Sequence, residues 1–318
     1  MKTRFILLIL LLAFGIAGAM AKKQALLIGI SNYNENVSGF KPLNGANDVD
    51  LLSGKLKKKG FTVKSLINSK ATKKNITKAL AALVASTAAG DEVYLHFSGH
   101  GQPVPDMNND EPDKYDQSFV CYDAYYTPRY TYAGKPYMGQ NHLIDDELFP
   151  YLNQLKKKVG KNGRVMVVFD SCYSEGNDRG ELKEDEPAPD SDLAIGLEED
   201  EPASDSVPEV EFSDIVRGTA DYFQVDKNSK DYLGSIKAPG AYSTGGELIV
   251  ISACGRNQRN WETKEIRTQK NYGALSYCIG KLLDDNIPLA QWKDIFSTRK
   301  YKRYKVFRDT QHPVAERY

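Results

Sequence analysis

The chain has 318 residues, of which 41% are hydrophobic and 26% charged, and its formal net charge is zero. The apolar fraction is enough for a packed core in one large domain or two small ones, and the balanced charge gives no reason to expect a nucleic-acid partner. The four cysteines are too few for a disulfide-stabilised scaffold, and the absence of a CxxC pair argues against a zinc site.

The first 21 residues resemble a secretory signal peptide. Lys2 and Arg4 are followed by an apolar run over residues 5–16, too short to cross a bilayer, and then by small residues at positions 19 and 21. We therefore expect cleavage before Lys22 and export to the periplasm or the exterior, with an uncleaved anchor as the alternative. No later segment is apolar enough to predict a stable membrane span.

From residue 24 onward, predicted strands alternate with predicted helices. Short apolar runs predict buried strands, and apolar residues at helical spacing predict helices. In chain order these are strand 24–30, helix 45–58, strand 61–67, helix 72–87, strand 92–97, short strand 118–122, helix 145–158, strand 164–169, strand 247–253 and helix 272–285. This alternation predicts an α/β fold, with a mostly parallel central sheet of about six strands and helices on both faces.

An acidic segment divides the chain. Residues 181–211 contain thirteen acidic residues and one lysine, with repeated proline and serine and little apolar periodicity. This composition is typical of a disordered or cleavable linker. The predicted organisation is therefore a signal peptide (1–21), a larger part (22–180), a linker (181–211) and a smaller part (212–318) that completes the same sheet.

Two residues with reactive side chains each follow the end of a predicted parallel strand. His100 stands between glycines after strand 92–97, and Cys172 follows strand 164–169. Catalytic groups collect at this edge of open α/β sheets, and an imidazole beside a thiol can generate the thiolate that attacks a carbonyl carbon. The backbone N–H groups of Gly101 and Cys172 are candidate donors to the resulting oxyanion. The spacing alone also allows an alternative without catalysis, in which Cys172 is a buried structural thiol and His100 lies in a surface turn.

Several motifs, in chain order, resemble those of caspases and, more closely, metacaspases. They are residues 42–52 (PLNGANDVDLL), 96–101 (HFSGHG), 113–119 (DKYDQSF), 143–148 (LIDDEL), 170–174 (DSCYS) and 250–254 (VISAC). The resemblance implies a caspase-like three-layer fold. It also implies a cysteine endopeptidase with protein or peptide substrates, in which His100 is the general base and Cys172 the nucleophile.

The resemblance also bears on specificity. Asp48 and Asp170 match acidic residues with which metacaspases hold the basic side chain before the scissile bond, and Ser98 is expected to line the same pocket. A guanidinium or ammonium group between two carboxylates is a favourable charge pairing. We therefore expect cleavage after Arg or Lys, rather than after Asp as in caspases. A solvated position for Asp48 and a purely structural role for Asp170 are the alternatives.

Four carboxylates are candidates for a calcium site. Asp116, Asp145 and Asp146 match residues that bind calcium in several metacaspases. Asp178 lies one residue away from the position at which the resemblance implies a fourth calcium ligand. Calcium prefers hard oxygen ligands such as these carboxylates. No other cofactor is expected. The alternative is that Asp145 only caps a helix whose first turn is acidic.

Basic residues lie in or beside the acidic segment: Arg179, Lys183, Arg217 and Lys227. If cleavage follows basic residues, these are candidate self-cleavage sites, because nicking concentrates in exposed segments. Alternatively, Arg179 or Lys183 could occupy the pocket as an inhibitor. Two other functions remain open: a non-catalytic peptide-binding module on the same fold, and a cysteine hydrolase that acts on something other than proteins.

Overall fold

The computed structural model describes residues 21–34, 38–106, 115–126, 131–132, 135–136, 139–172, 209–217, 241–255 and 258–318. Outside these lie the predicted signal peptide up to residue 20, the predicted linker over residues 181–208, and four residues with expected roles: Asp178, Arg179, Lys183 and Lys227. Within the described part of the chain, no helix has the length and apolar character needed to span a bilayer.

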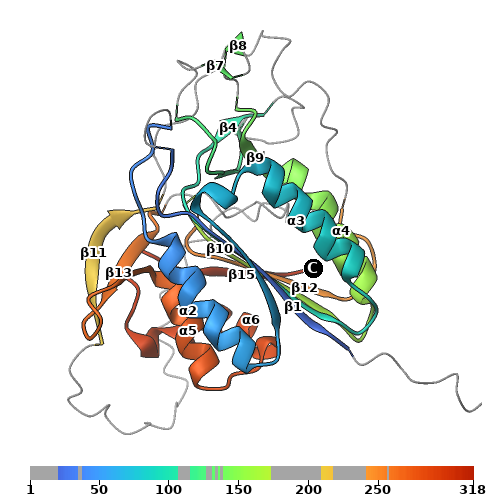
Figure 1. Cartoon of the computed structure of the whole chain (residues 1–318). Coiled ribbons are helices and arrows are strands. Elements are labelled where there is room, and N and C mark those ends of the chain that lie inside the picture. The colour runs from blue at the N-terminus through green and yellow to red at the C-terminus, as the bar shows by residue number, and fades with distance from the viewer. Residues whose placement is uncertain are drawn as a thin grey trace, which may run out of the picture.

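A six-stranded sheet lies at the centre of the molecule (Figure 1). In spatial order its strands are β15 (Val314–Arg317), β12 (Glu247–Ser252), β10 (Arg164–Asp170), β3 (Glu92–Ser98), β1 (Lys23–Gly29) and β2 (Thr62–Ile67). All neighbours are parallel except β15, which pairs antiparallel with β12. The four inner strands are continuous apolar runs because both faces of the sheet are buried.

Helices cover both faces of this sheet (Figure 1). On one face lie α3 (Lys73–Ser86) and α4 (Asp145–Val159), and on the other lie α2 (Gly45–Lys58), α5 (Ala274–Asp284) and α6 (Trp292–Ser297). Successive strand residues point to opposite faces, so Leu26 packs into the core under α3 and α4, whereas Leu27 packs into the core under α2 and α5. The predicted three-layer α/β fold is confirmed.

Local signals explain where several helices begin and end. The Thr72 hydroxyl accepts a hydrogen bond from the Asn75 N–H at 3.3 Å and so caps the start of α3. After α2, Gly60 adopts a positive φ of 86°, a conformation that favours glycine, and the chain turns into β2. The N-cap of α4 is Ile144, and Asp145 is the first residue inside the helix. The alternative in which Asp145 serves as the cap is therefore wrong.

A second, three-stranded sheet was not predicted from the sequence. It is antiparallel, in the order β11 (Val210–Val216), β13 (Trp261–Glu265) and β14 (Asn271–Gly273). Residues 210 and 211, which were expected to end the linker, belong to β11. Residues 272 and 273, expected to begin a helix, belong to β14, and α5 starts one residue later.

Short elements complete the described chain. Three two-stranded pairs are β4 (Val104–Pro105) with β5 (Tyr115–Asp116), β6 (Ser118–Val120) with β9 (His142–Ile144), and β7 (Thr131–Tyr132) with β8 (Lys135–Pro136). Three 3₁₀ helices are η1 (Asn68–Lys70), η2 (Leu289–Gln291) and η3 (Lys300–Tyr304). The pair of β6 and β9 matters for function, because β9 leads directly into α4 and sets its acidic first turn beside β5 and β6.

Candidate active site

His100 and Cys172 leave the central sheet at the same edge. Strands β3 and β10 are parallel neighbours whose last paired residues are Ser98 and Asp170. His100 and Cys172 each follow these residues by two positions, so the two segments emerge side by side. They are in close contact: a Cβ atom on Gly101 would lie 2.0 Å from the Cys172 carbonyl oxygen, so only glycine fits there.

The imidazole of His100 is buried and held from one side. Its Nε2–H donates to the Lys41 carbonyl oxygen at 2.8 Å, and Nδ1 has no hydrogen-bond partner among the described residues. The Tyr33 hydroxyl accepts a hydrogen bond from the His100 backbone N–H at 2.7 Å, and the rings of Tyr33 and Phe40 pack against the imidazole. Burial lowers the pKa of His100 to about 4. At neutral pH the imidazole is therefore uncharged and Nδ1 can accept a proton.

Cys172 is buried among backbone groups of the neighbouring loops. Its Sγ accepts a hydrogen bond from the Asn260 backbone N–H at 3.1 Å. The side chain of Asn260 in turn donates to Asp170 Oδ1 at 2.7 Å, which ties this loop to the end of β10. The backbone N–H of Cys172, predicted to stabilise an oxyanion, donates to the Arg217 carbonyl oxygen at 2.6 Å.

The three predicted pocket residues lie together and are fully buried. They surround the guanidinium group of Arg217. Its Nη1 lies 2.7 Å from Asp48 Oδ2 and 3.7 Å from Asp170 Oδ1. The same nitrogen donates to the Ser98 hydroxyl oxygen at 2.5 Å. Asp48, Ser98 and Asp170 therefore form one site that holds a basic group, and the solvated position considered for Asp48 is excluded.

Glu262 is a third pocket carboxylate that the sequence pattern did not reveal. Its Oε1 accepts hydrogen bonds from Arg217 Nε at 3.1 Å and from Nη2 at 2.9 Å. Asn44 orients the carboxylate by donating from its backbone N–H at 2.8 Å and from its side chain at 2.5 Å. Glu262 lies in β13, where a charged sequence (WETKE) gives no sign that one glutamate is fully buried.

The pocket contains more acidic groups than cations. Burial raises the pKa of Asp48 to about 7, an effect that the contact with Arg217 opposes and the charge of Asp170 reinforces. Burial by itself would lower the pKa of Arg217, but the attraction of Asp48, Asp170 and Glu262 outweighs it, and the pKa is raised. Because buried carboxylates without a counter-ion are costly, this pocket favours a bound cation and disfavours a further acid.

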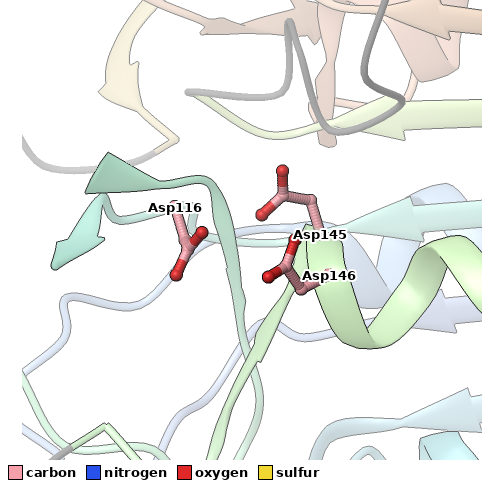
Figure 2. Close-up of side chains that lie close together, drawn as sticks. All are labelled: Asp116, Asp145 and Asp146. Atoms are coloured by element: carbon pink, nitrogen blue, oxygen red, sulfur yellow. The ribbon is translucent and has the colours of Figure 1, made fainter. Parts of the chain in front are cut away.

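Asp116, Asp145 and Asp146 also lie together, and all are buried (Figure 2). One side-chain oxygen from each falls within 4.8 Å of the others. Asp116 ends β5, whereas Asp145 and Asp146 begin α4, and the pairing of β6 with β9 brings these elements together. Three carboxylate oxygens at this spacing fit the ligand preference of calcium.

Comparison with known proteins identifies the family. The family described as the caspase domain matches residues 22–316. This chain belongs to the caspase domain family. The match runs through both sheets and includes every residue of the site described above.

Relatives of this caspase domain include the metacaspases. It is 33% identical to Metacaspase-1B of Aspergillus fumigatus over 172 residues, which are 51% of this chain and 37% of the relative. It is 27% identical to Metacaspase-1 of Schizosaccharomyces pombe over 291 residues, 85% of this chain and 61% of the relative. Each match thus spans less than two thirds of the relative. A solved structure of a Geobacter sulfurreducens protein matches 93% of each chain with a TM-score of 0.57 and 19% identity, which supports the fold alone.

Proposed function

We propose that this caspase domain is a cysteine endopeptidase that cleaves protein or peptide chains after Arg or Lys. One observation carries the proposal: a guanidinium lies among three buried carboxylates while the carbonyl oxygen of the same residue accepts a hydrogen bond from the Cys172 N–H. A substrate arginine would place its side chain and its scissile carbonyl in these two positions. Export is proposed as well, on the predicted signal peptide alone.

The residues of the site divide the chemistry between them. His100 accepts the thiol proton of Cys172 at Nδ1, and the thiolate attacks the carbonyl carbon of the substrate. The N–H groups of Cys172 and Gly101 stabilise the oxyanion. The imidazolium then protonates the leaving amine, and water hydrolyses the thioester with His100 again as base. The Lys41 carbonyl keeps the imidazole oriented throughout.

Peptides with Arg or Lys before the scissile bond should be cleaved about 1000-fold faster than matched peptides with Asp. The reason is charge: an Asp side chain would add a fourth carboxylate to the pocket, and an uncompensated buried charge costs about 3–5 kcal/mol. The measurement is kcat/KM for peptides that differ only in the residue before the scissile bond. The enzyme used is the protein that begins at Lys22.

A peptidyl electrophile that ends in Arg tests the nucleophile in the same preparation, because it should label Cys172. Turnover of Asp peptides together with inert Arg and Lys peptides would refute the specificity. Binding of Arg peptides without turnover or labelling would instead indicate a peptide-binding module.

Calcium is proposed to bind Asp116, Asp145 and Asp146, where it would neutralise three buried carboxylates. Titration calorimetry should detect a calcium site whose affinity falls about tenfold or more in Asp146→Asn, because one charged ligand is lost. Asp50→Asn, which changes an exposed acid of α2, is the matched control. Equal calcium affinity in the wild type and Asp146→Asn, with activity insensitive to a chelator, would show that calcium does not bind at this site.

A further inference from the structure

We infer that Gln311 is a positioning residue of the active site: it holds Asn260 where that residue contacts the nucleophile, the backbone of the bound chain and an acid of the pocket. This role rests on the proposed function, to which it adds a residue that none of the sequence motifs contains. Gln311 lies between η3 and β15, far along the chain from Cys172, and only the fold brings it to the site.

Asn260, the residue before β13, contacts three parts of the site. Its backbone N–H donates to Cys172 Sγ at 3.1 Å, and its carbonyl oxygen accepts the Arg217 N–H at 2.9 Å. Its side-chain amide donates to Asp170 Oδ1 at 2.7 Å. Because Arg217 stands where a substrate arginine is proposed to lie, the same carbonyl oxygen would hold the backbone of a substrate. The placement of Asn260 therefore affects the thiol, the bound chain and the pocket together.

The side chain of Gln311 holds Asn260 in this place. Its Nε2 donates to Asn260 Oδ1 at 2.8 Å and to the Ala253 carbonyl oxygen at 3.2 Å, while Oε1 accepts the Trp261 backbone N–H at 3.2 Å. Ala253 follows β12 and Trp261 begins β13, so one side chain joins the ends of two strands that belong to different sheets. Gln311 is only 1% exposed, so water does not compete for these hydrogen bonds.

A second glutamine joins the same two segments in the opposite direction. Gln258, two residues before Asn260, accepts at Oε1 the His312 N–H at 2.9 Å and the Gly255 N–H at 3.3 Å. His312 directly follows Gln311. The residues before β13 are thus tied to the segment before β15 at two adjacent points. Groups that act on a reacting atom need support of this kind, because their own hydrogen bonds do not fix their direction.

The contact between Asn260 and Cys172 has a chemical consequence. A hydrogen bond donated to sulfur stabilises the thiolate more than the thiol, and the thiolate is the attacking species. Placement also matters, because an error of about 1 Å at a reacting group costs about 100-fold in rate. Without Gln311, the buried Asn260 Oδ1 and the Trp261 N–H lose their partner, and Asn260 is no longer held beside the sulfur.

The test replaces Gln311 with leucine, which has a similar size but forms no hydrogen bonds. In Gln311→Leu, kcat/KM for an Arg peptide should fall about 10- to 100-fold. The pH midpoint of Cys172 alkylation by a small uncharged reagent should rise by about half a unit or more. Rates are expressed per Cys172 labelled to completion, so a smaller folded fraction does not count as a loss. The matched control is Gln24→Leu, which removes a glutamine with two side-chain hydrogen bonds at the opposite edge of the sheet and should match the wild type.

Two further variants give the same information if Gln311→Leu does not fold. Gln311→Glu keeps the shape and one acceptor oxygen but sets a carboxylate against the oxygens of Asn260 and Ala253, so it should lose activity as well. Asn260→Ala removes only the side chain that Gln311 holds, and it should also raise the pH midpoint of alkylation. In the Asn260→Ala background, replacing Gln311 should cost less than about threefold more, because both residues act through the same contact.

Failure of the positioning role can be distinguished from failure of the proposed function. Wild-type kcat/KM in Gln311→Leu overturns the role and leaves the peptidase intact. A lower kcat/KM with an unchanged alkylation profile also overturns it, because Gln311 would then support only the fold. So does a loss that is fully additive with that of Asn260→Ala, or an equal loss in Gln24→Leu. Absence of peptide turnover and of Cys172 labelling in the wild type refutes the peptidase, and the positioning role with it.

Discussion

Replacing Cys172 with alanine should lower kcat on Arg peptides by about 10⁴-fold or more, because the substitution removes the proposed nucleophile. The fold should survive. The side chain that is lost is small, and its contact with the Asn260 N–H is a single hydrogen bond worth about 1 kcal/mol. The measurement is kcat and KM on one Arg peptide, together with the thermal unfolding midpoint of each variant.

The matched control is Cys278→Ala, which removes another fully buried thiol, from α5 on one face of the sheet. It should keep the activity of the wild type at a small cost in stability. His100→Ala should lose activity to a degree similar to Cys172→Ala, because residues that act as one unit do not contribute additively. Substantial turnover by Cys172→Ala, or an equal loss in Cys278→Ala, would show that the nucleophile lies elsewhere.

Asp48→Asn should lower kcat/KM for Arg and Lys peptides by about 100- to 1000-fold. The substitution keeps the shape of the side chain but removes the carboxylate that lies 2.7 Å from the bound guanidinium. A buried charge that loses one of its partners costs about 3–5 kcal/mol, and here two other carboxylates remain to offset part of that cost. The measurement is kcat/KM for matched peptides with Arg, Lys and Gln before the scissile bond.

Two comparisons show whether Asp48→Asn changes the choice of substrate or damages the fold. The rate on the Gln peptide should change little, and a small alkylating agent without a basic group should modify Cys172 at the rate seen in the wild type. Asp50→Asn, two residues further along α2 and exposed, should match the wild type in every assay. Equal losses on charged and uncharged peptides would mean that Asp48 supports the fold rather than the choice of substrate.

The long elements of the fold and the two reactive residues were predictable from the sequence. Strands buried on both faces must be apolar along their length, and helices that cover them carry an apolar stripe, so both produce strong local patterns. Helix α2 has the predicted bounds, and the five strands of the central sheet that were predicted differ from expectation by one residue at one or both ends. His100 and Cys172 were identifiable because each directly follows such a strand.

Only the tertiary structure decided what the site contains. The pairing of β3 with β10 places residues that are 72 positions apart side by side, and no local pattern encodes which strands become neighbours. Glu262 lies on β13 and Arg217 directly follows β11, and both strands are partly exposed with charged sequences that resemble solvated loops when read alone. Arg217 is buried among the opposite charges of Asp48, Asp170 and Glu262, and Glu262 is buried against Arg217. That charge complementarity exists only after distant segments have come together.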